Sequence, residues 1–206
     1  MDMLKLTNQS ETVVNISNMA VKYPLLPLLL VVKVYATYWV EYVQEHNDIR
    51  SNVSPLAANM KKLMYSQELE SIAQQHANRC SFLHNDNRSR ESRTFSRVGE
   101  NIFTGTKGSN ISNAIQYWSQ QGDSYNFQTN ECQLFFFCEY YTQVTWADSE
   151  YVGCGKADCG TNTFVVCNYG PSSDLDGRPY IPAASCSACP FGYICENKLC
   201  RRFFNV

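Results

Sequence analysis

The sequence has little charge of either sign and no cluster of basic residues. Charged residues make up 17% of the 206 residues, and the formal net charge is −2. Binding to nucleic-acid phosphates requires a clustered basic excess, so the composition argues against a nucleic-acid-binding function. The densest basic stretch runs from Arg88 to Arg97, but Ser and Glu are interspersed among its arginines. We expect this stretch to be a solvated loop.

The sequence also lacks an apolar run long enough to span a bilayer. The apolar run over residues 24–34 is shorter than the roughly 20 residues that a spanning helix needs, and it contains Lys33. Its basic start and the small residues at its end are typical of a secretory signal peptide, here over residues 19–36. Because the polar residues 1–18 precede this signal, we expect translation to start at Met19. A signal anchor is the alternative.

No common catalytic arrangement is found in the sequence. None of the serines lies in a nucleophile elbow of the G-x-S-x-G type. A catalytic thiol needs a free cysteine near a histidine, whereas the ten cysteines can pair without remainder. His46 and His76 lie at core-facing positions of predicted helices, where a histidine is typically hydrogen-bonded and structural. We therefore expect a protein that is not an enzyme and has no cofactor.

Cysteine, by contrast, is abundant. Ten cysteines in 206 residues, an even number, are typical of a secreted protein with a disulfide framework. Sequons at Asn87 and Asn110 fit an extracellular, glycosylated surface. We expect secretion and N-glycans at both asparagines. The spacing of the cysteines alone does not select one pairing among the alternatives.

The residue patterns predict an α+β protein. Three stretches show apolar residues at helical spacing and predict helices: 37–51, 66–80 and 109–122. A shorter helix is predicted over residues 142–146. Three further stretches predict strands, of which the last two are joined by a turn: 99–103, 151–157 and 163–169. Helices separated by such an antiparallel pairing indicate a layered α+β domain.

Past Gly170 the composition changes. Prolines predict an extended linker, and four cysteines follow within residues 186–200. We divide the chain into residues 1–36 with the signal peptide, 37–171 as the main domain, and 172–206 as the linker and a small disulfide-rich module. The tail spacing C-x2-C-x5-C-x4-C argues against zinc, because a structural zinc site usually repeats short ligand pairs.

The segment from Cys132 to Cys138, C-Q-L-F-F-F-C, is the most unusual part of the sequence. Its two cysteines enclose four large apolar residues: Leu134, Phe135, Phe136 and Phe137. If the cysteines are bonded to each other, the loop is too small to bury these side chains by itself. Two interpretations remain open. Either the rest of the domain covers the loop, or the loop is an exposed apolar patch that contacts lipid, membrane or protein.

Seven short motifs, in order along the chain, carry a resemblance to a known family. They are H-N-D-I-R (46–50), C-S-F-L-H (80–84), G-E-N-I-F (99–103), Y-T-Q-V-T-W (141–146), V-G-C-G (152–155), F-V-V-C-N-Y-G-P (164–171) and G-R-P-Y-I-P (177–182). By these motifs the chain resembles the CAP superfamily, which includes cysteine-rich secretory proteins, antigen 5 and group 1 pathogenesis-related proteins. Its tail cysteines are most similar to those of venom-allergen-like members.

The resemblance implies a three-layer α-β-α sandwich with a C-terminal cysteine-rich extension. It also implies five disulfides: Cys80 with Cys159, Cys132 with Cys138, Cys154 with Cys167, Cys186 with Cys195, and Cys189 with Cys200.

Many members of the family carry two His and two Glu in a central cleft, a set able to hold a divalent metal. His84 and Glu100 match the first of each, but the second Glu falls on Gln121 and the second His on Tyr140. Gln121 cannot ionise, and Tyr140 is mostly protonated at neutral pH, so neither is a good metal ligand. Catalytic zinc generally needs three protein ligands. We therefore expect no tight metal site and a structural hydrogen-bonded pair of His84 and Glu100.

In the family, the loop that matches Cys132 to Cys138 is implicated in sterol binding, and a groove between two helices can hold fatty acyl chains. We expect a secreted, non-enzymatic protein that binds a sterol at this loop or a fatty acid in the groove, with peripheral membrane contact. The alternative is an effector or allergen-like ligand that binds an extracellular protein partner through its surface loops.

Overall fold

The computed structural model describes residues 41–172 and 177–203. They belong to one compact unit that begins at Trp39. The main domain and the cysteine-rich tail are thus parts of the same unit. The predicted signal peptide and the expected translation start lie outside the described residues.

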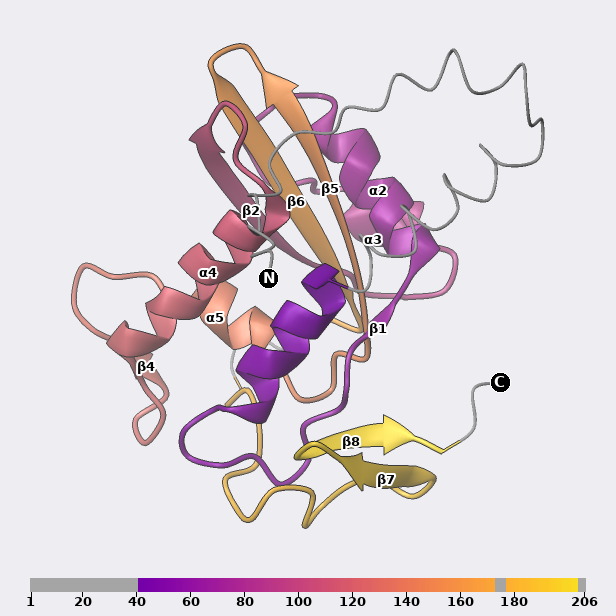
Figure 1. Cartoon of the computed structure of the whole chain (residues 1–206), viewed down its shortest axis with the longest axis vertical. Coiled ribbons are helices and arrows are strands. Elements are labelled where there is room, and N and C mark those ends of the chain that lie inside the picture. Colours follow the sequence, from indigo (N-terminus) through magenta and orange to yellow (C-terminus); the bar gives the residue numbers. More distant parts are fainter. Residues whose placement is uncertain (1–40, 173–176, 204–206) are drawn as a thin grey trace, which may run out of the picture. The chain divides into compact units, whose positions relative to one another are not determined.

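A four-stranded sheet with the strand order β1-β5-β6-β2 forms the middle layer (Figure 1). β1 (Met64–Tyr65) runs parallel to β5 (Tyr151–Cys159), and β5 pairs antiparallel with β6 (Asn162–Gly170). β6 in turn pairs antiparallel with β2 (Gly99–Thr106). The three strands that the sequence predicts are confirmed, and each is longer than predicted. The β5–β6 hairpin turns tightly at Gly160, with φ +69°, so both strands run up to the turn, and β2 pairs with β6 as far as Thr106.

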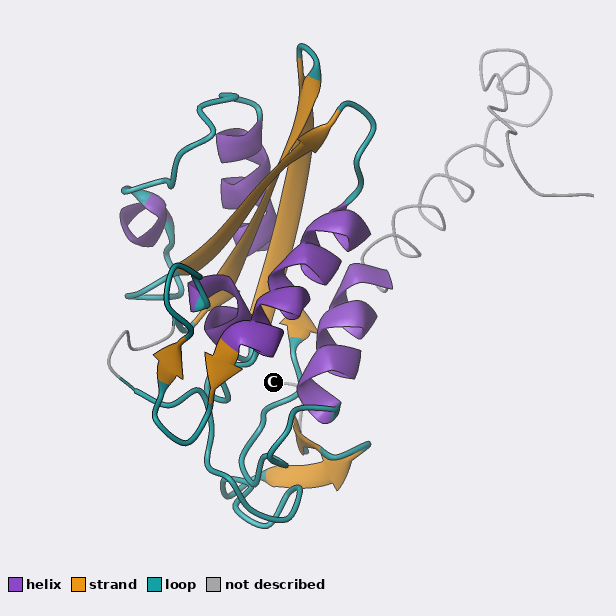
Figure 2. Cartoon of the chain, turned by 90° about the vertical axis from the view of Figure 1, so that its left-hand side faces the viewer, coloured by secondary structure: helices purple, strands orange, loops and turns teal. Residues whose placement is uncertain are grey.

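Helices cover both faces of this sheet, and Figure 2 shows the strands between the two helical layers. α2 (Gln67–Ala77) packs on one face. The other face is covered by the helix over residues 41–51, α4 (Ile111–Gln120) and α5 (Glu139–Val144). The arrangement is the predicted three-layer α-β-α sandwich.

The two cores follow from the period of two along β6. Phe164 and Val166 pack in the cluster on the α2 side, whereas the intervening Val165, Cys167 and Tyr169 belong to the larger cluster on the α4 side. All five side chains are fully buried. A continuous apolar run in this strand is therefore the pattern of a sheet that is buried on both faces.

The V-G-C-G motif in β5 allows α2 to lie unusually close to the sheet. A Cβ atom at Gly153 would lie 2.0 Å from the backbone N of Glu70, and one at Gly155 would lie 2.4 Å from the Cα of Gln74. Backbone atoms of a packed helix cannot yield to such contacts. Only glycine therefore fits at both positions.

α2 begins where predicted but ends earlier. The Ser66 hydroxyl accepts a hydrogen bond from the backbone N–H of Leu69 and caps the helix. The prediction that the helix reaches Cys80 was wrong, because the helix ends at Ala77. Cys80 has φ +50°, outside the α-helical region, and it bonds to Cys159 at the end of β5.

Two other helices differ slightly from the prediction. α4 starts after Asn110, whose side chain forms a reciprocal capping box with Asn113, and the 3-10 helix η2 (Gln121–Ser124) continues it past the predicted end. The last short helix, predicted over residues 142–146, begins and ends earlier as α5.

Several short elements were not predicted, among them three that lie near the cleft and the phenylalanine-rich segment. α3 (Arg88–Glu91) lies within the arginine-rich stretch that was expected to be a loop throughout. β3 (Tyr125–Asn126) and β4 (Glu131–Cys132) form a small hairpin immediately before the phenylalanine-rich segment. Segments this short carry no periodicity of their own.

The structure contains the same five disulfides that the resemblance implied: Cys80–Cys159, Cys132–Cys138, Cys154–Cys167, Cys186–Cys195 and Cys189–Cys200. The sulfurs of Cys186, Cys189 and Cys200 lie within 4.8 Å of one another because two disulfides are neighbours. All of them are oxidised, so they are not thiolate ligands for zinc.

The tail folds into a hairpin of β7 (Tyr193–Glu196) and β8 (Leu199–Arg202) that packs against the main domain. The backbone N–H of Cys200 donates to the carbonyl of Met60 at 2.7 Å. Arg202 holds both carboxylate oxygens of Glu150 at 2.9 Å, a bidentate pair. Among the residues that the structure describes, no helix is long and apolar enough to cross a membrane.

Candidate functional site

A cleft of about 510 Å³ opens beside the start of β2, between the segment that contains α3 and the N-terminal part of α5. His84, Glu100 and Tyr140 line this cleft together with polar side chains from the surrounding loops. The structure thus brings together three of the four positions at which the family carries its His and Glu residues.

Glu100 is the buried centre of this cleft. Its side chain is inaccessible to solvent. Oε1 lies 3.0 Å from Nδ1 of His84 and accepts a hydrogen bond from the backbone N–H of Asn85 at 2.8 Å. The amide nitrogen of Asn168, in its better-satisfied orientation, donates to Oε2 at 3.1 Å. These three contacts use most of the roughly four lone-pair sites of a carboxylate, so Glu100 is mainly a structural acceptor.

His84 and Tyr140 form the accessible part of the cleft. The His84 side chain is 43% exposed, and its ring centroid lies 6.1 Å from that of Tyr140. Burial raises the pKa of Tyr140, and the nearby Tyr117, Glu139 and Glu100 raise it further. The phenol therefore stays protonated at neutral pH.

Gln121 lies directly after α4, next to the Cys132–Cys138 disulfide. Its backbone carbonyl oxygen is 3.6 Å from Cys138 Sγ. Its side-chain Oε1 is buried, with no hydrogen-bond partner among the described residues. Gln121 is not among the side chains that line the cleft.

A divalent metal does not fit this set of donors. Gln121 and Tyr140 supply an amide and a protonated phenol, and the carboxylate of Glu100 is already occupied by three donors. Metal sites of the catalytic type use at least three anionic or imidazole ligands. We derive no metal chemistry from this cleft.

Several cleft residues were not singled out from the sequence. Gln143, in the Y-T-Q-V-T-W motif, is buried, and its Nε2 donates to the hydroxyl of Ser149 at 3.1 Å. A Cβ at Gly99 would lie 2.0 Å from Oε1 of Gln143, so the glycine of the G-E-N-I-F motif makes room for this side chain. Both residues lie in motifs that carry the family resemblance, and these motifs were the sequence feature that could have indicated them. Arg88 also lines the cleft, and no sequence pattern marked it.

The two histidines assigned to the core are structural. His46 is fully buried, with Nδ1 2.7 Å from the carbonyl of Tyr42 and Nε2 2.8 Å from the hydroxyl of Tyr169. Burial lowers the pKa of His46 to about 4, despite the hydrogen bond to the Tyr42 carbonyl. Its imidazole is therefore neutral at physiological pH. Nε2 of His76 lies 2.7 Å from the carbonyl of Leu83.

The phenylalanine loop, residues 132–138, projects into solvent. Its apolar side chains are exposed by 60 to 92%: Leu134 78%, Phe135 92%, Phe136 60% and Phe137 75%. Phe135 lies at the turn of the loop, with φ +69°. Cys138 is buried and precedes α5. Of the two interpretations that the sequence left open, the exposed patch is the one that the structure supports.

The phenylalanine loop and the cleft share the Cys132–Cys138 disulfide, since both of its cysteines line the cleft. Below this disulfide, Tyr125 donates from its hydroxyl to Oδ1 of Asn130 at 2.6 Å, and both residues also line the cleft. The exposed apolar loop is thus continuous with a polar pocket.

A second groove, of about 520 Å³, lies between the helix over residues 41–51 and α4. Only two of the side chains that line it are apolar, Ile49 and Ile115. Three carboxylates line the same groove: Glu45, Asp48 and Asp123. Repulsion from these carboxylates and the polar lining make the groove a poor site for a fatty acid.

The two predicted glycosylation sites, Asn87 and Asn110, are both exposed. Asn87 directly precedes α3, and Asn110 caps α4 with its Oδ1. The amide nitrogen that would carry a glycan is not the atom that caps the helix.

Glu68, on α2, holds the loop that follows α3. Its carboxylate accepts hydrogen bonds from the hydroxyls of Ser92 and Thr94 and from the backbone N–H groups of Arg93 and Thr94. Burial of the carboxylate raises its pKa, but these hydrogen bonds outweigh burial and lower the pKa of Glu68 to about 2. A carboxylate whose pKa falls on folding stabilises the native state at pH values above its ordinary range.

We expect the Glu68→Gln substitution to destabilise the protein by about 1 kcal/mol at pH 6, a discounted value for a partly exposed group. The difference from the wild type should shrink as the pH falls from about 4.5 to about 2, because the wild-type carboxylate is then protonated. Urea unfolding at several pH values measures it. A difference that does not change with pH would show that the charge of Glu68 has no role.

Comparison with known proteins places these features in a family. The sequence profile described as "Cysteine-rich secretory protein family" matches residues 43–169. Peptidase inhibitor 16 of Mus musculus is 38% identical over 173 residues, which cover 79% of this chain and 33% of the relative. Glioma pathogenesis-related protein 1 of Mus musculus is 39% identical over 162 residues, 78% of this chain and 63% of the relative.

Among solved structures, the venom allergen-like protein 4 of Schistosoma mansoni is similar, with a TM-score of 0.61 and 29% identity. The match covers 70% of this chain and 94% of that protein. This chain spans 33% and 63% of the length of the two curated relatives. The profile match, these relatives and the shared fold show that the chain belongs to the CAP family of cysteine-rich secretory proteins.

Proposed function

We propose that this chain is a secreted, non-enzymatic CAP protein that binds a sterol through the phenylalanine loop. The single observation that carries the proposal is the exposure of four consecutive large apolar side chains on a loop closed by the Cys132–Cys138 disulfide. Contiguous exposed apolar patches on soluble proteins mark sites of contact with ligands, membranes or partners.

The chemistry of a sterol fits this surface. Burial of a Phe side chain contributes about 1.5 to 3 kcal/mol when it is complete, so partial burial of several rings is enough for useful affinity. A sterol has one hydroxyl group at the end of a rigid apolar body. The hydrogen-bonding groups of Tyr125 and Asn130 line the cleft together with Cys132 and Cys138, which close the loop, and they are suited to that hydroxyl.

The cleft supports the non-enzymatic part of the proposal. Its only buried carboxylate among the described lining residues, Glu100, is held by three donors, and the neighbouring phenol of Tyr140 is kept protonated by burial. Ten oxidised cysteines leave no thiol nucleophile. We do not extend the proposal to a fatty acid in the second groove, because three carboxylates line it.

Replacing Phe135, Phe136 and Phe137 together by Ser is expected to weaken sterol binding by about a hundredfold, the effect of losing roughly 3 kcal/mol of apolar contact. A fluorescent sterol competition assay on protein secreted from eukaryotic cells measures the affinity. Circular dichroism and the thermal midpoint should not change, since the three rings contact mainly solvent.

Phe191 provides the matched control, because it is also fully exposed, with a relative accessibility of 106%, but belongs to the C-terminal tail. The Phe191→Ser variant should keep the wild-type affinity. Equal loss in both variants, or no sterol binding by the wild type, would contradict the proposal. In the latter case the phenylalanine loop would be assigned to an extracellular protein partner.

A further inference from the structure

The arginines of this protein fall into two groups. Most of those that the structure describes have partners. Arg50, Arg88 and Arg178 donate to backbone carbonyls. Three others pair with carboxylates: Arg79, Arg201 and Arg202. Arg97 also has an interaction partner. The exceptions are Arg90 and Arg93.

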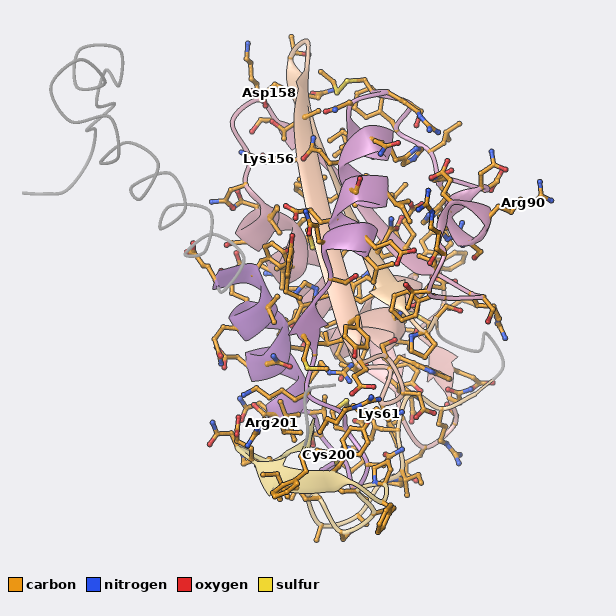
Figure 3. The ribbon with its side chains drawn as sticks, turned by 90° about the vertical axis from the view of Figure 1, so that its right-hand side faces the viewer. Lys61, Arg90, Lys156, Asp158, Cys200 and Arg201 are labelled. Carbon is orange, nitrogen blue, oxygen red and sulfur yellow. A yellow bond between two sulfur atoms is a disulfide. The ribbon has the colours of Figure 1, made fainter. Side chains whose placement is uncertain are left out.

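Arg90 and Arg93 are exposed, and their guanidinium groups have no polar partner among residues 41–172 and 177–203. Figure 3 shows Arg90 pointing outward from α3, away from the body of the protein. The two residues are three positions apart on one short segment. We call this pair the arginine surface.

The backbone that carries the arginine surface is nevertheless fixed on both sides. Before Arg90, the Arg88 side chain donates to the carbonyls of Val98 and Asn85, each at 2.9 Å. After it, Glu68 accepts four hydrogen bonds from the loop at residues 92–94. A rigid segment with two free guanidinium groups is preorganised for an anionic ligand, since little backbone entropy is lost on binding.

The surrounding charge is positive although the whole chain is slightly acidic. Between Arg79 and Arg97 the sequence has five arginines and two acidic residues, Asp86 and Glu91, and Glu68 of α2 adds one further carboxylate beside the loop at residues 92–94. Glu91 is itself engaged by Arg79 at 3.5 Å and by the amide of Asn85 at 2.9 Å. It is therefore not available to neutralise Arg90.

The arginine surface lacks the apolar side chains that a lipid-binding surface needs. Between residues 85 and 98, none of the described large apolar side chains is exposed, and Phe95 packs beside Tyr151 with ring centroids 5.6 Å apart. Guanidinium groups form paired hydrogen bonds with planar or tetrahedral oxyanions. The partner should thus be an anionic polymer with oxyanions spaced along it.

We propose that the arginine surface binds a sulfated glycosaminoglycan chain. Such a chain presents sulfate and carboxylate groups at regular intervals, and an extracellular protein meets it at cell surfaces and in the matrix. Arg90 and Arg93 are not among the residues that line the cleft beside the phenylalanine loop, so we expect the polysaccharide and the sterol to bind independently. The interaction is electrostatic and falls with salt.

The test uses the full secreted protein and immobilised heparin as the probe. The wild type should be retained and elute only when salt is added. The Arg90→Gln/Arg93→Gln variant should bind about tenfold more weakly, because two charge-assisted hydrogen-bonding groups are lost. Both proteins are compared in the Asn87→Gln background, so that a glycan next to α3 cannot mask the surface.

A second double variant, Lys107→Gln/Lys198→Gln, is the matched control. It removes the same charge from exposed positions elsewhere and should keep wild-type retention. The proposal is overturned if heparin does not retain the wild type, or if both double variants lose affinity equally. It is also overturned if phosphatidylserine vesicles bind the wild type while heparin does not, because the partner would then be a membrane. Sterol binding, measured in parallel, should be the same in all these variants.

Discussion

The Arg50→Met substitution is expected to lower the free energy of unfolding by about 4 kcal/mol, a value reached by few single substitutions. Arg50 is almost completely buried in the helix over residues 41–51. Its guanidinium donates to five carbonyl groups from two segments: Lys61, Val144, Trp146, Ala147 and Ser149. Methionine fills a similar volume but removes the guanidinium donor from all five carbonyls. Those of Trp146 and Ala147 keep a backbone donor, whereas the other three lose their side-chain donor.

The size of this effect follows from the burial of the carbonyls. Each buried acceptor that loses its partner costs about 1 to 3 kcal/mol. Burial also lowers the pKa of Arg50 to about 9, offset by the nearby Tyr169 and Asp148, so the group remains a cation at neutral pH. Val144 is the last residue of α5, and a cation at a helix C-terminus is favoured by the helix dipole.

Unfolding in guanidinium chloride at neutral pH, with the disulfides intact, measures the change in the free energy of unfolding. Arg178→Met is the control, since Arg178 is exposed and donates only to the carbonyls of Phe127 and Gln128. It should cost about 1 kcal/mol or less. If Arg50→Met unfolds at the wild-type denaturant concentration, the role assigned to Arg50 is wrong.

The Gln121→Glu/Tyr140→His double variant is expected to gain affinity for Zn²⁺ by about a thousandfold over the wild type, because it supplies two ligands that the wild type lacks. Gln121 lies three residues after Trp118, whose ring centroid is 6.2 Å from that of Tyr140. The imidazole at position 140 would lie beside His84, and the carboxylate at position 121 would replace a buried amide oxygen that has no hydrogen-bond partner among the described residues.

Isothermal titration with Zn²⁺ and the thermal midpoint with and without the metal measure this gain. Without metal, the variant should be less stable than the wild type, since a carboxylate would be placed where the Oε1 of Gln121 is already buried without a hydrogen-bond partner among the described residues. Adding His84→Ala to the double variant should reduce the zinc affinity again. Equal weak binding by the wild type and the double variant would show that more than two substitutions separate this cleft from a metal site.

The strands and the cap of α2 could be predicted because they depend on local patterns. The continuous apolar run of β6 and the spacing after Ser66 are sufficient by themselves. The end of α2 could not be predicted, because the helical spacing continues to Cys80, whereas the helix ends at Ala77 and Cys80 has a positive φ and bonds to Cys159 in a distant strand.

The candidate site was less accessible to prediction. The position of His84 beside Glu100 came from the resemblance, since the two residues lie on different segments. The exposure of Phe135 could not be foreseen, because a short apolar run has the same sequence whether it is covered or not. Arg50 was also missed, since a fully buried arginine runs against the usual exposure of charged residues.

The small ring closed by Cys132 and Cys138 links the maturation of the protein to its recognition surface. The two cysteines are only six positions apart, so the bond removes most of the freedom of the segment before any ligand arrives. Until the thiols are oxidised, the phenylalanine rings belong to a flexible segment with no fixed display. If the chain is secreted as proposed, this apolar surface is completed in the oxidising compartment of the secretory route, and a copy retained in a reducing compartment would carry the same residues without it.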